Sequence, residues 1–234
     1  DVIYYTLDGS RPTKESNVYE GPITITESCK LTAVTYRGIA RSEFAEKWYE
    51  VVAVPTVASI EDFNDITDSY RGIAGFDLAV AYQFKNTAFV TDGKSWTHVY
   101  TEDYEFKNGD IIPQGNVFEK YTDETGHLHL ELVSECTPVA GSPVEPVVST
   151  IADFTTDDYD KYIHLVGVRF DAKNCIAIEL GENAVNVLNP FESNLPTVNN
   201  ECDIIAIVGQ TEAGALVIYP TEFLESTVIF DISS

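Results

Sequence analysis

The chain opens with Val2-Ile3-Tyr4-Tyr5-Thr6-Leu7-Asp8-Gly9-Ser10, a run of β-branched and aromatic residues that ends in a tight-turn signal. Such residues favour extended backbone, and Asp-Gly supplies the positive φ angles that a tight turn needs. Two further runs of strand-forming residues, 30–36 and 42–49, follow after segments rich in Gly, Pro and polar residues. The first fifty or so residues are therefore predicted to form a small β-domain.

This segment also carries a family resemblance. The string Tyr5-Thr6-Leu7-Asp8-Gly9-Ser10, together with 12–13, 19–23 and 31–34, is similar to the chitobiase/β-hexosaminidase C-terminal module. The resemblance implies a small fibronectin-like β-sandwich over residues 1–52, used as an accessory module of secreted enzymes and surface proteins. In that family the motif forms a turn and part of the core, so it implies no catalytic residues. Members usually have a strand before Ile3, which implies an exposed edge strand in this copy.

An internal repeat follows. The nonapeptide PTVASIEDF at 55–63 returns as PVVSTIADF at 146–154, and Asp110-Ile111-Ile112 returns as Asp203-Ile204-Ile205. Each copy begins with a hydroxyl residue and an Asp three residues later, which predicts a single short helical turn with its Ile and Phe packed inward. The remainder of the chain is therefore predicted to be a duplication.

About five strands are predicted in each copy, at 73–84, 87–91, 95–100, 110–120 and 127–134, and then at 162–170, 175–180, 184–189, 202–210 and 215–220. Five short strands fit a small barrel better than a seven-stranded sandwich. The pattern resembles the tandem oligonucleotide/oligosaccharide-binding (OB) folds of surface proteins from Gram-negative bacteria. The predicted class is all-β, with a sandwich at 1–52 and OB-like barrels at 55–138 and 146–228.

The composition restricts the classes of partner that the chain can bind. The sequence has 14 basic and 38 acidic residues, a formal charge of −24. This charge disfavours nucleic acid and anionic membranes, and no apolar run approaches the ~18–20 residues that span a bilayer. No signal peptide precedes Asp1, so we expect an export signal and further domains outside this sequence, and a secreted or cell-surface location.

The four cysteines lie far apart, without CxxC or CxxH spacing, at Cys29, Cys136, Cys175 and Cys202. This spacing gives no support to a zinc-finger or thioredoxin-like site. A disulfide between Cys175 and Cys202 and buried free thiols both remain open.

The first candidate site is aromatic. Trp96, His98 and Tyr100 share one face of the strand 95–100, where such barrels usually bind ligands, and Tyr104 lies nearby in the sequence. Exposed rings there would stack on a sugar. Two alternatives remain for Trp96: it aligns with the apolar Val185 of the second copy and so fits a core position, or it lies in a contact between domains.

The second candidate site is a metal site. His127, His129 and Glu131 share a strand face, and imidazole and carboxylate are metal ligands. Because these side chains extend over ~13 Å of strand, a solvated polar face is the alternative. Acidic clusters at Asp62, Asp65 and Asp68, and at Asp157, Asp158 and Asp160, suggest calcium by ligand type, but they lack EF-hand spacing.

The sequence has no nucleophile elbow, no phosphate-binding glycine loop and no His-Glu-x-x-His motif. We therefore expect a non-catalytic binding or spacer module with no cofactor other than calcium, and carbohydrate is the favoured ligand class by analogy of fold. The alternatives are a purely structural or adhesive surface protein without a small-molecule site, and an accessory part of a larger secreted glycoside hydrolase.

Overall fold

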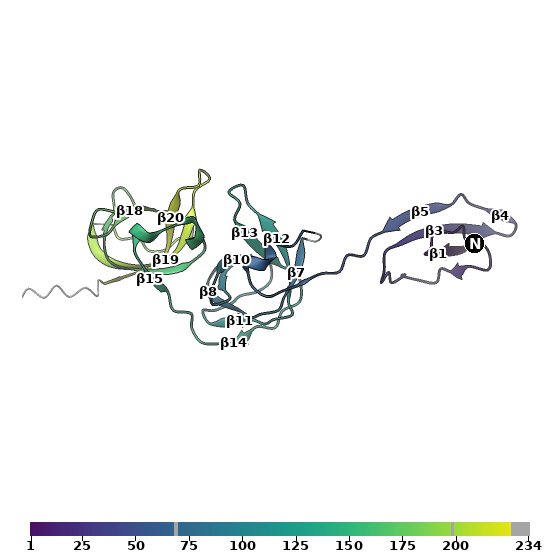
Figure 1. The fold of residues 1–234 in the computed structure, drawn as a ribbon, viewed down its shortest axis with the longest axis horizontal. Helices are drawn as coiled ribbons and strands as arrows, with labels where there is room; N and C mark the ends of the chain where they lie inside the picture. The colour runs from purple at the N-terminus through teal and green to yellow at the C-terminus, as the bar shows by residue number, and fades with distance from the viewer. Residues whose placement is uncertain (68–69, 198, 226–234) are drawn as a thin grey trace, which may run out of the picture. The chain divides into compact units, whose positions relative to one another are not determined.

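The computed structural model describes residues 1–67, 70–197 and 199–225, and β-strands dominate it (Figure 1). The predicted all-β class is confirmed. The chain divides into two compact units, Asp1–Ala53 and the residues from Val54 onward. Among the described residues, no helix is long and apolar enough to cross a membrane.

The first unit is one antiparallel sheet with the order β2-β1-β3-β4, in which β5 also pairs with β3. Its strands are β1 (Val2–Thr6), β2 (Asn17–Val18), β3 (Cys29–Arg37), β4 (Ala40–Arg41) and β5 (Ala45–Tyr49). The Asp8-Gly9-Ser10 turn forms as predicted: Gly9 has φ +76°, and Asp8 Oδ1 accepts a hydrogen bond from the Ser10 amide at 2.9 Å. These strands form a single layer rather than two facing sheets.

The two faces of this sheet differ because side chains alternate along a strand. Thr32 and Val34 are buried on one face. On the other face, Ile3, Tyr5 and Leu31 line an open, largely apolar groove of about 370 Å³.

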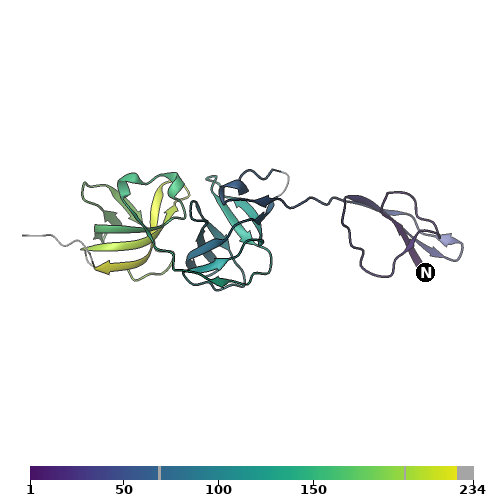
Figure 2. The ribbon, with the colours of Figure 1, turned by 60° about the horizontal axis from the view of Figure 1, so that its bottom comes forward.

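The second unit begins with a curled sheet of nine strands, in the order β14-β11-β8-β9-β10-β13-β12-β7-β6. Its strands are β6 (Thr56–Val57), β7 (Arg71–Ala74), β8 (Leu78–Phe84), β9 (Thr87–Thr91), β10 (Trp96–Tyr100), β11 (Asp110–Ile112), β12 (Val117–Thr122), β13 (Leu128–Leu132) and β14 (Val139–Ala140). Strands β7 and β8 follow each other in the chain but lie near opposite ends of this order, so the sheet curls back on itself as a barrel (Figures 1 and 2).

The last part of the unit is a closed barrel of five strands, β16-β17-β18-β20-β19, which the β16–β19 pairing closes; β15 adds to β16. Its strands are β15 (Val147–Ser149), β16 (Tyr162–Asp171), β17 (Ile176–Ile178), β18 (Ala184–Val187), β19 (Asn200–Gln210) and β20 (Leu216–Glu225). In both barrels the third strand runs parallel to the fifth, as β10 does to β13 and β18 to β20. The two halves of the repeat therefore share one strand order.

Two predicted strands of the first barrel are broken, and each break has a physical cause. The segment 73–84 divides at Gly75, whose amide donates to the Val57 carbonyl at 2.8 Å and so pairs with β6 instead. The segment 110–120 divides after Ile112, because Pro113 has no amide donor and Gly115 adopts φ +91°. The second barrel keeps the corresponding strands whole.

Each barrel has its own core, and the repeated Ile and Phe contribute to both. Ile60 and Ile151 are buried, Phe63 is fully buried, and Phe154 is partly buried against the second core. The short 3-10 turns η1 (Glu61–Phe63) and η2 (Ile151–Asp153) hold them near the start of each copy. A third turn, η3 (Thr156–Asp158), leads into the second barrel.

A third apolar cluster joins the two barrels, and we call it the junction. Ala81 and Phe89 come from the first barrel, and Tyr162, Phe191 and Ile207 come from the second. The Phe191 ring lies 5.1 Å from that of Tyr82 and 5.6 Å from that of Phe89, measured between centroids. The barrels therefore pack through their outer faces, and this packing positions the candidate site.

Candidate functional site at the barrel junction

The two candidate groups of the sequence lie on one face of the first barrel. Strand β10 runs beside β13 with Val99 opposite Leu130, which places His98 next to His129. The two predicted triplets are therefore neighbours on adjacent strands: Trp96, His98 and Tyr100 on one side, and His127, His129 and Glu131 on the other. Each triplet was visible in the sequence, but their adjacency was not.

Four rings form a row across this face. His98 pairs in register with Phe89 on β9, and His129 pairs with Tyr121 on β12. The His98 and His129 rings are stacked with centroids 4.9 Å apart and an interplanar angle of 11°. Tyr121 continues the stack on His129 at 5.8 Å.

The entrance to the second barrel supplies the partners of this row. Asp160 Oδ2 lies 2.7 Å from His98 Nδ1, and Asp160 is only 3% exposed. Tyr159 stacks on His127 with centroids 4.2 Å apart. Asp160 has φ +64°, a left-handed conformation that non-glycine residues rarely adopt, and this backbone turn directs its carboxylate to the junction.

The pKa values of the two stacked histidines shift in opposite directions. Burial disfavours the charged form of His98, but the charge and hydrogen bond of Asp160 outweigh burial, so the His98 pKa is raised. Burial and then the positive charge of His98 lower the pKa of His129. The pair therefore holds one proton readily and a second with difficulty. Nδ1 of His129 is buried and has no hydrogen-bond partner among the described residues.

Beside the row, an open cleft of about 420 Å³ lies between the barrels. Its aromatic walls are Trp96 and His127 of the first barrel and Tyr159 of the second. The remaining lining is mostly polar and includes Glu61, Asn64, Lys94, Ser95, Thr156 and Asp157. The cleft therefore combines flat rings with hydrogen-bonding groups of both kinds.

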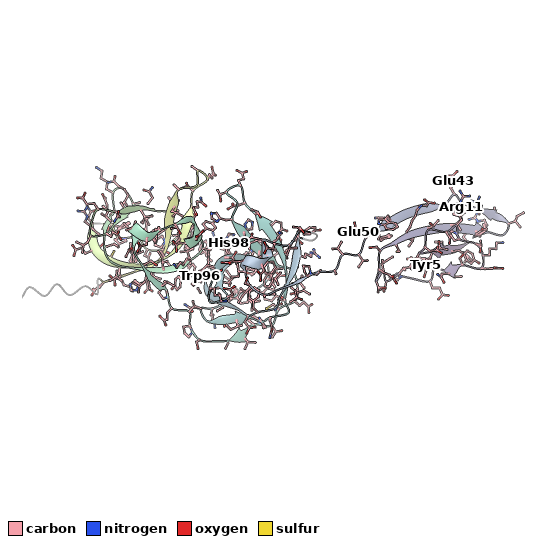
Figure 3. The ribbon with its side chains drawn as sticks, viewed as in Figure 1. Tyr5, Arg11, Glu43, Glu50, Trp96 and His98 are labelled. Carbon is pink, nitrogen blue, oxygen red and sulfur yellow. The ribbon has the colours of Figure 1, made fainter. Side chains whose placement is uncertain are left out.

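The four residues of the predicted aromatic site are not brought together. Trp96 is half-buried, packs against the junction and also lines the cleft; Trp96 and His98, both on β10, are labelled in Figure 3. Tyr100 is 41% exposed at the far end of the strand. Tyr104 packs on the core of the first barrel, where its hydroxyl accepts a hydrogen bond from the Cys136 amide at 2.8 Å.

The predicted metal ligands also have separate contacts. His127 stacks on Tyr159, His129 lies within the ring stack, and Glu131 Oε2 accepts a hydrogen bond from the Tyr121 hydroxyl at 3.0 Å. In the described part of the chain, no group of three His, Cys, Asp or Glu side chains is arranged to hold a metal ion.

Three members of the acidic clusters make contacts within the fold. Asp62 Oδ2 accepts a hydrogen bond from the Ala58 amide, Asp158 pairs with Lys161 at 2.8 Å, and Asp160 pairs with His98. Asp68 lies outside the described residues. All four cysteines are free, with Cys175 and Cys202 both in the second core.

The sequence interpretation placed Asp160 only in an acidic cluster, and it gave no role to Tyr159. One signal of the junction was present. Ala88, Phe89 and Val90 are consecutive apolar residues in a strand, and all three are buried. A strand that buries both faces needs a partner on each side, so Phe89 indicated a contact outside its own barrel.

Comparison with known proteins finds one similarity, which lies in the first unit. Residues 1–45 match the family model described as the chitobiase/beta-hexosaminidase C-terminal domain. No curated protein and no solved structure matches the chain. The resemblance carried by Tyr5-Thr6-Leu7-Asp8-Gly9-Ser10 is thus confirmed for residues 1–45.

Proposed function

We propose that this chain is a non-catalytic accessory part of a larger, exported carbohydrate-active protein, and that its second unit binds glycan. The observation that carries the proposal is the match of residues 1–45 to a C-terminal domain of enzymes named for cleaving amino-sugar glycans. A domain of this kind accompanies a catalytic domain, and the remaining 54–225 then supply binding or spacing.

Two physical features support carbohydrate over other ligands. The formal charge of −24 disfavours phosphate backbones, which rely on neutralisation by basic side chains. The cleft at the junction offers flat rings beside mixed donors and acceptors, the combination that a sugar ring with its hydroxyl groups requires.

The experiment uses the whole chain on a glycan array and on insoluble polysaccharides, with chitin and cellulose included. We expect retention of the chain on at least one glycan, and no hydrolysis of 4-nitrophenyl glycosides. Absence of retention on every glycan would contradict the proposal, and turnover of a glycoside would contradict its non-catalytic part.

A second candidate is a structural spacer without a small-molecule site. The buried junction supports it, because a contact around Phe191 and Ile207 would hold the two barrels at a fixed spacing. A spacer would have the same docked barrels as a glycan-binding module, but it would not be retained on any glycan. The array therefore separates the two candidates.

A further inference from the structure

The cleft between the barrels has contributions from both copies of the repeat. Glu61 and Ser95 come from the first barrel, and Thr156 and Tyr159 come from the entrance to the second. Its volume of about 420 Å³ lies within the range of about 300–1,000 Å³ that is usual for small-molecule sites. We propose that this cleft is a composite saccharide site, in which a neutral sugar ring is held between Trp96 and Tyr159; this inference rests on the proposed function.

The rings are held in place before any ligand arrives. Tyr159 is stacked on His127 with an interplanar angle of 17°, and it also makes an edge contact with His98 at 6.3 Å. Trp96 packs against the junction cluster while it lines the cleft. Binding therefore orders few side chains, and the apolar face of a sugar ring can stack at low entropic cost.

The polar groups suit hydroxyl groups. Ser95 Oγ donates to Glu61 Oε1 at 2.8 Å, which leaves further acceptor capacity on that carboxylate. Lys94 supplies donors, Asn64 supplies both donor and acceptor, and all of these residues line the cleft.

The charges of the cleft favour a neutral ligand. Lys161 is paired with Asp158 at 2.8 Å, and Asp160 is paired with His98 at 2.7 Å. Lys94 then faces a cleft that also contains Glu61 and Asp157. An anionic sugar would meet the acidic surface of the chain. Lys94 offsets one of the two carboxylates Glu61 and Asp157, so only a weak attraction remains for a cationic sugar.

The site depends on docking of the barrels, because Trp96 and Tyr159 belong to different copies. The contacts that hold the copies together here include the His98–Asp160 pair, the Tyr159–His127 stack and the packing of Phe191 on Phe89. The first barrel alone would lack the Tyr159 ring, and the second alone would lack the Trp96 ring. The duplication therefore creates a site that neither copy has by itself.

The test uses the full chain. Trp48 is 62% exposed in the first unit, and the sequence has two tryptophans, so Trp48→Phe leaves Trp96 as the sole tryptophan. We expect its fluorescence to change saturably with glucose, N-acetylglucosamine or one of their β1,4-linked oligomers. Glucuronic acid and glucosamine are the charged counterparts, and tighter binding of either charged sugar would overturn the neutral-ligand assignment.

Calorimetry on the Trp48→Phe chain then compares variants with the sugar that binds. Trp96→Ala and Tyr159→Ala should each weaken binding by about tenfold or more. Tyr100→Ala removes a ring from the same strand outside the cleft and should stay within about twofold. Since Tyr159→Ala also removes a junction contact, Asn64→Ala serves as a second cleft variant and should weaken binding without a change in melting temperature.

The outcomes separate the two proposals. Binding that is equal in all the variants would overturn the cleft and leave glycan binding intact at another surface. Absence of binding by the unsubstituted chain, on the array and in calorimetry, would overturn both. Loss of binding in Trp96→Ala and Asn64→Ala with Tyr100→Ala unaffected would support the cleft.

Discussion

Asp160 is the residue on which the junction depends most. It combines near-complete burial, a left-handed backbone conformation and a 2.7 Å contact with His98. A buried carboxylate is costly without a partner, so the contact stabilises the docked arrangement only while both groups keep their complementary charges.

Asp160→Asn tests this pair with little change in shape. The His98 pKa should fall, because the carboxylate whose charge and hydrogen bond raise it is gone. The free energy of unfolding should drop by about 1–2 kcal/mol, near the lower end for hydrogen bonds to charged groups since His98 is partly solvated. NMR titration of the His98 ring measures the first effect and urea denaturation the second. Asp157 lines the same cleft, so Asp157→Asn is the control and should change neither the His98 pKa nor the free energy of unfolding. An unchanged His98 pKa in Asp160→Asn would refute the pairing.

The stacked histidines predict a pH optimum for stability. The raised pKa of His98 means that its contribution is full below the ordinary value of 6.5 and is lost as pH rises through its folded pKa. The lowered pKa of His129 means that its contribution is present above 6.5 and is lost as pH falls through its folded pKa. Stability of the second unit should therefore be greatest around pH 6.5.

Thermal unfolding between pH 4 and 9 measures this profile. His129→Phe keeps a ring in the stack but removes the imidazole that titrates. The difference in stability between this variant and the parent chain should therefore contain only the loss at low pH, the acid limb of the profile. Asp160→Asn should flatten the alkaline limb instead. A profile that is flat from pH 5 to 8 in the parent chain would count against the proton-sharing pair.

At the scale of elements, the sequence predicted the strands well where local rules decide. The runs around 87–91 and 162–170 have the β-branched and aromatic residues of strands and the turn residues that bound them. The breaks at Gly75 and Pro113 were missed. The first depends on pairing with β6, a contact that local sequence does not encode, whereas Pro113 marks the second break in the sequence because it has no amide donor for a strand ladder.

The candidate site was less predictable for the same reason. That His98 and His129 face each other depends on the parallel pairing of β10 with β13, whose residues are far apart in the sequence. The roles of Tyr159 and Asp160 depend on how one barrel packs on the other. The sequence supplied the residue types and the strand faces, but the pairing and docking are long-range properties.

The repeated Ile-x-Asp-Phe elements predict unequal core contributions. Phe63 is fully buried and contacts Phe118 edge-to-face, with centroids 6.0 Å apart. Phe63→Ala should cost about 3–5 kcal/mol of unfolding free energy, the usual cost for a core phenylalanine. Phe154→Ala, the partly buried counterpart, should cost less. Denaturant titration of both variants decides, and equal or negligible losses would contradict the assigned packing.

At the scale of the whole molecule, the acidic excess limits the partners. With a formal charge of −24, association with a nucleic acid would lack the counterion release that normally drives it. We expect no detectable binding of single-stranded DNA or RNA at about 150 mM salt. Fluorescence anisotropy with a labelled oligonucleotide checks this, and micromolar affinity at that salt concentration would contradict the electrostatic argument.

The two barrels act as one unit through the junction, where Phe191 packs against Phe89, and through the stack of Tyr159 on His127 beside it. The most direct measurement is an NMR nuclear Overhauser experiment on the whole chain with labelled aromatic side chains. The docked arrangement predicts cross-peaks between the rings of Phe191 and Phe89, whose centroids are 5.6 Å apart, and between those of Tyr159 and His127, at 4.2 Å. Absence of both cross-peaks, with relaxation rates that show the barrels tumbling separately, would contradict it.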